Sequence, residues 1–313
     1  MRSLPIVLLL LSACGESLVV LDEALVAERL DWISEAVPLC QGAPSRAAAT
    51  SAALGPIFSS IFDDLPPPPD VGSQIRGGSC GGGLWLWTDH ARGNTDYVAT
   101  FEDYCVETRD GPLVLDGVFE ATEHGTPTDS GPLISAVEVR TAGPVDMTHD
   151  GEPMSLSLDR TVVAYGNPST WSPDPPTEDR PDQIQIRSAS ITMPDGKTVT
   201  ARNVRLESTS SEPAMLHVRN GDLILSGEGR VGMRTDPDAP IAFDLSGVNV
   251  FNGTLELRGA RGTVLEVTPR QGQPGTFDLA IDGTPFDQHI DCGLGVLPFA
   301  EIALALTSAL PAH

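Results

Sequence analysis

The residues best suited to chemistry lie in a glycine-rich stretch at positions 77–83. Residues 77–81 read Gly-Gly-Ser-Cys-Gly, which matches the G-x-S-x-G pattern around a nucleophilic serine, so Ser79 is a candidate for catalysis. That pattern needs a strand before the serine, a helix after it, and a histidine within reach. A strand pattern follows Ser79 instead, and a run of glycines produces such matches by chance. Ser79 therefore carries only an alternative hypothesis, that of a hydrolase acting on glycan or peptide.

Metal binding is the second chemistry that the residue types allow. The six histidines include no pair at metal-ligating spacing on one predicted helix, and no cysteine lies in a C-x-x-C motif. Acidic loops at 178–182 and 236–238 offer oxygen atoms for calcium, but neither has the spaced order of an EF-hand loop. Phosphate loops and dinucleotide fingerprints are also missing. We expect solvated acidic loops and no cofactor.

Two predicted helices come first among the elements that would position a functional site. Apolar residues recur at helical spacing within 18–37 and again within 45–65, which predicts two amphipathic segments. Their polar faces are acidic and lack the many Lys and Arg of a helix lying on a membrane. We therefore expect both segments to pack on the rest of the protein.

A linker and then a strand-rich region follow. Four prolines at 66–69 favour an extended spacer, and we assign the linker to residues 66–83. From residue 84 the chain shows alternating apolar residues between short Asx-Gly signals, which are typical of tight hairpin turns. These signals are Asp110-Gly111, Asp150-Gly151, Asp195-Gly196, Asn220-Gly221, Asn252-Gly253 and Asp282-Gly283. The spacing predicts about a dozen antiparallel strands over 84–291.

The predicted fold class is mainly β, a large antiparallel meander with helices packed on it. So many strands cannot stay flat, so we expect a curved open sheet, a partial barrel or a sandwich. The apolar alternation changes phase within 184–193 and within 199–206, which indicates β-bulges. The proline-rich loop at 167–182 is either a boundary between two β halves or a surface excursion, and we favour the excursion.

The last segment returns to helical spacing. An apolar stripe over 298–310 has Glu301 as its only charge, so this helix must be covered by the sheet or by the helix at 18–37. The expected organisation is an N-terminal helical segment at 14–65, the linker at 66–83, the β domain at 84–291 and a C-terminal helix at 292–313.

Composition limits the partners. The chain has 313 residues with 43 Asp and Glu against 19 Lys and Arg, a net charge of −24. Such an acidic surface repels nucleic acid and anionic lipid headgroups. Aromatic residues make up only 5% of the chain, with 31 Gly and 27 Pro, which favours many turns and a thin core over a dense enzyme interior.

The first residues carry an export pattern. One Arg is followed by a short apolar run that closes with Leu-Ser-Ala-Cys at 11–14. This ending resembles the lipobox of bacterial lipoproteins. The resemblance implies a signal peptide at 1–13 and acyl chains on Cys14 that anchor the protein in a membrane. Because Gly15 rather than Asp follows the cysteine, it also implies the outer membrane, on either its periplasmic or its outward face. It covers about 14 residues and is silent on activity.

Lipidation of Cys14 would leave four cysteines for disulfides in an oxidising compartment. Four cysteines allow three connectivities. We favour Cys80–Cys105, which would link neighbouring strands, and Cys40–Cys292, which would tie the helical start of the chain to its end.

Two functions from different classes remain. The first is a membrane-anchored, exported, non-enzymatic module with a structural or ligand-binding role. In outline it resembles periplasmic lipoprotein carriers, which implies an apolar cavity for a lipid between the sheet and the helices at 18–37 and 298–310. The alternative is an envelope hydrolase that uses Ser79. The sequence names no protein partner.

Overall fold

The computed structural model describes residues 17–28 and most of 71–291. Within the second range the residues left out are 79, 92–93, 109–110, 130, 150, 170–179, 193–195, 210–213, 228, 244–249 and 272–275. The helices predicted over 45–65 and 298–310, and the second half of the one over 18–37, lie outside the described residues. No helix in the described part is long and apolar enough to span a membrane.

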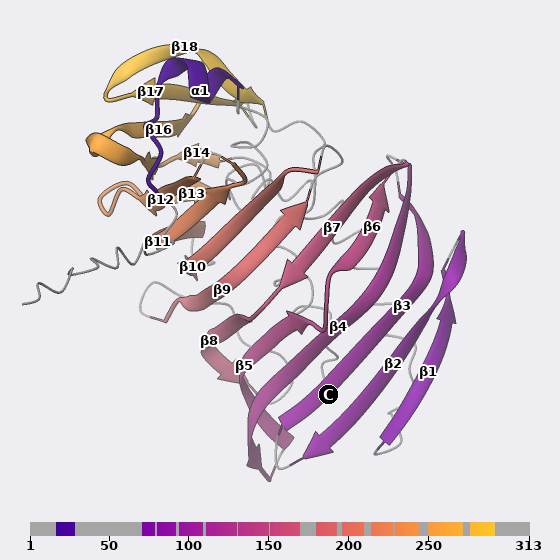
Figure 1. Ribbon diagram of the computed structural model, residues 1–313. Helices are drawn as coiled ribbons and strands as arrows, with labels where there is room; N and C mark the ends of the chain where they lie inside the picture. The colour runs from indigo at the N-terminus through magenta and orange to yellow at the C-terminus, as the bar shows by residue number, and fades with distance from the viewer. Residues whose placement is uncertain are drawn as a thin grey trace, which may run out of the picture.

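The described chain is mainly β and forms one large antiparallel sheet (Figure 1). Its strands are β1 Val71–Gly77, β2 Gly81–Ala91, β3 Asn94–Thr108, β4 Gly111–Thr128, β5 Gly131–Thr141, β6 Val145–His149, β7 Glu152–Leu158, β8 Thr161–Ser169, β9 Asp182–Thr192, β10 Thr198–Thr209, β11 Ala214–Leu225, β12 Gly229–Thr235, β13 Ile241–Phe243, β14 Val250–Asn252, β15 Leu255–Arg258, β16 Val264–Pro269, β17 Thr276–Ile281 and β18 Thr284–Asp291. The predicted antiparallel meander is thus confirmed, with more strands than the dozen expected.

The sheet is a meander in which, at several points, two short strands lie end to end and pair with one longer neighbouring strand. β5 and β6 pair with different halves of β4, β7 and β8 pair with different parts of β9, and β12 and β13 pair with different parts of β11. The order therefore runs from β1 at one edge to β18 at the other, as Figure 1 shows. Because β8 pairs with β9, the strands on the two sides of residues 170–181 belong to the same sheet.

One face of this sheet is apolar and buried. Alternating strand residues point to opposite faces, and the apolar ones gather into a single cluster that extends from β2 to β17. Fully buried members include Val145, Leu156, Leu255, Leu265 and Val267. The opposite face carries the charged residues, many of which form ion pairs across strands.

A line of irregular backbone positions crosses the sheet, and we call it the crease. It comprises Gly82, Asp103, Gly117, residues 142–144, 159–160 and 187–188, Asn203, Gly221, residues 236–240 and Gly253. These positions lie side by side in the strand register. For example, the Asn220 side chain donates to the Asn203 carbonyl at 2.8 Å, and the Asp159 amide donates to the Ser188 carbonyl at 2.9 Å. The rows of strands from β2 to β14 are therefore interrupted at the same level, and such interruptions bend a sheet.

The crease explains the two predicted phase changes. Ile186 and Ala189 of β9 are both buried, and so are Ala201 and Val204 of β10, with Asn203 at a φ of 52° between the latter two. An extra residue at a bulge shifts the alternation, so the apolar residues on both sides of the crease stay on the same face. The bulge predicted within 199–206 is confirmed by the register shift between β10 and β11. In β9 the alternation does change phase within 184–193, but the pairing of β9 with its neighbours shows no register shift, so no bulge is present there.

Three features of the strand region differ from the sequence-based expectation. Asn252-Gly253 is no hairpin turn, because β14 before it pairs with β13 and β15 after it pairs with β12 and β16. Asn220-Gly221 is no hairpin turn either, because it lies inside β11 at the crease. A Cβ atom on Gly221 would come within 2.9 Å of Val204, so the glycine allows close packing there. In addition, β1 occupies part of the expected linker, and all seven of its residues pair with β2.

The only helix longer than one turn in the described residues is α1, Glu23–Glu28. Asp22 caps it by accepting a 2.9 Å hydrogen bond from the Leu25 amide. The helix predicted from residue 18 therefore begins only at Glu23, and the segment before it bonds to the sheet instead: the Val19 amide donates to the Arg230 carbonyl at 3.0 Å. Leu21 and Val26 join the apolar cluster with exposed fractions of 2% and 0%. A single turn of 3₁₀ helix, η1 Ala260–Gly262, lies beside this segment.

Candidate functional site

The most unusual group on the apolar face is a carboxyl, that of Glu123. It lies in the second half of β4, directly opposite Thr95 of β3. The strand alternation turns Glu123, Thr95 and Tyr97 toward the buried side, and each is 4% exposed. The Tyr97 hydroxyl donates a hydrogen bond of 2.9 Å to Glu123 Oε2. We call these three residues the polar cluster.

Burial controls the charge of this cluster. It raises the pKa of Glu123 from 4.5 to about 7, against a smaller lowering by the hydrogen bond from Tyr97. Burial, and then the nearby charge of Glu123, raise the pKa of Tyr97 above its ordinary value, so the tyrosine stays protonated. Glu123 therefore exchanges its proton near neutral pH, while Tyr97 remains a hydrogen-bond donor. The pair can bind a hydroxyl or a cation in apolar surroundings.

This cluster is not among the sites predicted from the sequence, although the sequence contains a signal for it. The alternation in β4 places Leu113, Leu115, Phe119 and Ala121 on the inner side, and the next position in that series is Glu123. A carboxyl at an apolar position of a strand indicates a buried charge. That Tyr97 is its partner depends on the register of β3 against β4, which no local pattern provides.

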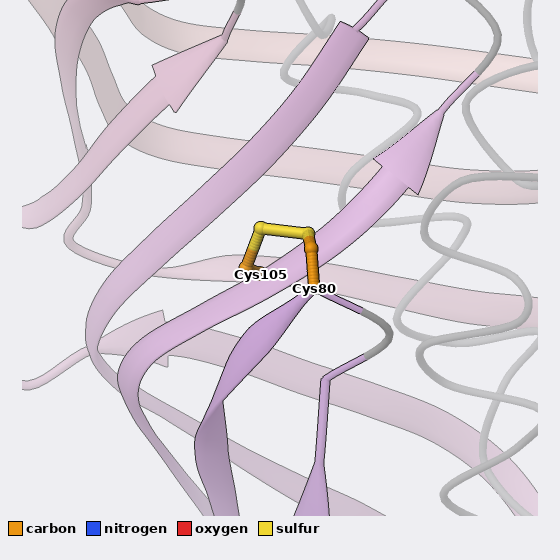
Figure 2. The surroundings of a disulfide bond; sticks show 2 residues. All are labelled: Cys80 and Cys105. Atoms are coloured by element: carbon orange, nitrogen blue, oxygen red, sulfur yellow. A yellow bond between two sulfur atoms is a disulfide. The ribbon is translucent and has the colours of Figure 1, made fainter.

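Cys80 and Cys105 form a disulfide, in agreement with the predicted pairing (Figure 2). The bond joins the turn before β2 to β3, and the Cys80 amide also donates to the Cys105 carbonyl at 3.2 Å. The glycines around it have a packing role. A Cβ atom on Gly78 would lie 2.1 Å from the Cys105 carbonyl oxygen, and one on Gly82 would lie 1.9 Å from that of Asp103.

These contacts bear on the Ser79 hypothesis. The G-x-S-x-G pattern requires a helix after the serine, whereas β2 follows here, and the neighbouring glycines are explained by close backbone approach. Ser79 itself lies outside the described residues, as do Cys14, Cys40 and Cys292. Lipidation of Cys14, the Cys40–Cys292 bond and catalysis by Ser79 therefore stay predictions.

The acidic loops have structural partners where they are described. Asp236 Oδ1 accepts a 2.9 Å hydrogen bond from the Asp238 amide, and Asp182 Oδ1 accepts one of 2.9 Å from the Gly166 amide. Among the described residues, no group of three His, Cys, Asp or Glu side chains is arranged to hold a metal ion. His124 lies 3.9 Å from Glu138, which also binds Arg160 at 2.7 Å on the outer face.

Comparisons with protein-family models, with curated proteins and with solved structures found no match to this chain. Its function must therefore be argued from its own sheet and polar cluster.

Proposed function

We propose that this chain is a non-enzymatic ligand-binding module, exported and anchored to a membrane through Cys14, whose creased sheet holds an apolar or lipid ligand. The observation that carries the proposal is the apolar face itself. It runs through nearly the whole sheet, and Glu123 is the only charged residue among those buried in the described part of the chain. An amphiphile has the same division, a long apolar part and one polar end.

The contact at α1 restricts where such a ligand would lie. Leu21 and Val26 fill the junction between α1 and the sheet, and a Cβ atom on Gly259 would lie 3.0 Å from the Leu21 side chain. We therefore place the ligand toward the β3–β4 end of the apolar face, with its polar group at Glu123 and Tyr97. If the sheet binds no ligand, the non-enzymatic module has a purely structural role.

Native mass spectrometry tests the proposal on two forms of the full chain. The unchanged protein, extracted from membranes, should carry covalent acyl chains, and the Cys14→Ser variant should lose them and leave the membrane fraction. We expect the Cys14→Ser protein to retain a non-covalent lipid-sized adduct, because ligand and anchor are separate. Loss of the adduct together with the acyl chains would leave the purely structural role.

The hydrolase alternative has its own test. A serine-directed fluorophosphonate probe should label the unchanged protein but not Ser79→Ala if Ser79 is an activated nucleophile. Because β2 rather than a helix follows Ser79, we expect no labelling of either protein.

A further inference from the structure

Two tryptophans stand exposed on the outer face of β2. Trp85 and Trp87 are two residues apart, so they share one side of the strand, and each is 38% exposed. The register places Thr100 beside Trp85 and Val98 beside Trp87 on β3. Val118 of β4 pairs in turn with Thr100. We call these five residues the tryptophan platform.

Most of the exposed charges around the platform are negative. Strands β2, β3 and β4 contain eight Asp and Glu residues and no Lys or Arg. Of these eight, Glu123 is buried on the opposite face, and Glu120, which lies beside Val98, is paired with Arg140. Asp96, Glu102 and Asp116 are exposed near the platform, and Asp89 is partly exposed. One of them, Asp96, accepts a 2.6 Å hydrogen bond from Thr122 Oγ1, which holds a carboxylate at the edge of the platform without neutralising it.

Elsewhere on the outer face many of the acids are paired with arginines. Ion pairs there join Glu120 to Arg140, Glu138 to Arg160, Asp159 to Arg187, Glu207 to Arg219, Asp222 to Arg230, and Glu256 to both Arg234 and Arg258. In the described part of the chain, Asp96, Glu102 and Asp116 form no ion pair with Lys or Arg, and they lie near the exposed aromatic rings. Exposed large apolar side chains mark interaction surfaces, and charges of one sign around them favour a partner of the opposite charge.

We propose that the tryptophan platform binds a basic protein segment that places Lys or Arg side chains over Trp85 and Trp87. An indole ring is the best aromatic partner for a cation, and the alkyl stems of Lys and Arg would cover the rings and Val98. The surrounding carboxylates attract the cationic groups and repel acidic partners. This surface lies on the opposite side of the sheet from the polar cluster, so the proposal does not depend on the ligand-binding function.

A fluorescence titration of the full chain tests this, with a short synthetic peptide of alternating Lys and Leu as the probe. The matching Glu and Leu peptide and a neutral chitin oligosaccharide serve as comparison ligands. We expect the basic peptide to bind and the other two not to bind. The Trp85→Thr, Trp87→Thr double variant should weaken binding of the basic peptide about tenfold or more, as measured by calorimetry.

A charge variant tests the role of the surrounding carboxylates separately from that of the tryptophans. Glu102→Gln should weaken binding about two- to threefold at low ionic strength, whereas Asp287→Asn, an exposed acid on β18 at the far edge, should leave it unchanged. Failure of the basic peptide to bind the unchanged protein overturns the proposal. So does equal binding by the unchanged protein and both platform variants, or binding of the oligosaccharide alone.

Discussion

Gly117 of β4 and Val145 of β6 approach so closely at the crease that a Cβ atom on Gly117 would lie 3.0 Å from the Val145 Cα atom. Gly117 also has a φ of 141°, which residues with a side chain rarely adopt. The bend of the sheet at this point thus depends on the absence of a side chain at one position. The aromatic rings of Phe101 and Phe119 meet edge to face beside it, with centroids 5.7 Å apart.

The first prediction concerns this close approach. Gly117→Ala should lower the free energy of unfolding by about 2–4 kcal/mol, through backbone strain and overpacking against Val145. The matched control is Gly143→Ala, since Gly143 also lies on the crease but an added Cβ atom meets nothing within 4 Å. We expect the control to change stability by less than about 0.5 kcal/mol in urea unfolding. Equal effects of the two changes would show that the crease does not constrain Gly117.

The second prediction is a dependence of stability on pH that comes from Glu123. Its pKa is about 7 in the fold against an ordinary value of 4.5, so between these pH values the folded state binds more protons than the unfolded chain. The free energy of unfolding should therefore be highest below about pH 4.5 and should fall by about 3 kcal/mol as the pH rises to 7. This contribution should become constant only about one pH unit above 7, where the folded carboxyl is fully ionised.

Glu123→Gln isolates this effect, because the amide keeps an acceptor for Tyr97 but cannot ionise. The difference in unfolding free energy between the variant and the unchanged protein should grow in favour of the variant from pH 4.5 to pH 7. Denaturant unfolding across this range measures it. Parallel pH profiles for the two proteins would mean that Glu123 does not titrate in the buried environment described here.

The third prediction concerns Tyr97. Tyr97→Phe removes the hydroxyl that donates to Glu123 Oε2, and this hydrogen bond lowers the pKa of Glu123. The pKa of Glu123 should therefore rise further, which a carboxyl-carbon NMR titration would show. The substitution should lower the free energy of unfolding by about 1.5–3 kcal/mol at pH 8, where the carboxylate is charged, and by less at pH 5. A pKa that falls or stays the same would argue against the hydrogen bond.

The fourth prediction concerns the disulfide. The Cys80–Cys105 bond closes a loop with a sequence separation of 25, and chain-entropy arithmetic assigns it about 3–4 kcal/mol. The Cys80→Ser, Cys105→Ser variant should lose this stability, as measured by urea unfolding under oxidising conditions. Addition of a reductant should lower the stability of the unchanged protein but not that of the double variant, apart from effects of the other cysteines. Free thiols at both positions by mass spectrometry would contradict the pairing.

Several features of the sheet could be predicted because they depend on near neighbours in sequence. The meander follows from alternating apolar residues between turns. The bulge near Asn203 follows from the change of phase between Ala201 and Val204. Cys80 and Cys105 could be paired because the bond is expected to link neighbouring strands, which lie close together in the sequence. The turn predicted at Asp282-Gly283 is also present, with positive φ at both residues.

Other features could not be predicted because they depend on register. Asn220-Gly221 has the residues of a hairpin turn, yet the pairing of β11 with β10 and β12 keeps it within a strand. The same registers place separate bulges and strand ends side by side, and together these form the crease. No local window contains that information, since it depends on pairing between distant residues.

The sequence by itself therefore determined the mainly β class, the acidic charge and the alternation that gives the sheet one apolar face. Only the tertiary structure decided that Tyr97 donates to Glu123 and that the exposed tryptophans lie among acids without arginine partners. The physical reason is that alternation specifies which face a side chain occupies. Its neighbour across the strand, and hence its pKa or its binding partner, is set by how the strands align.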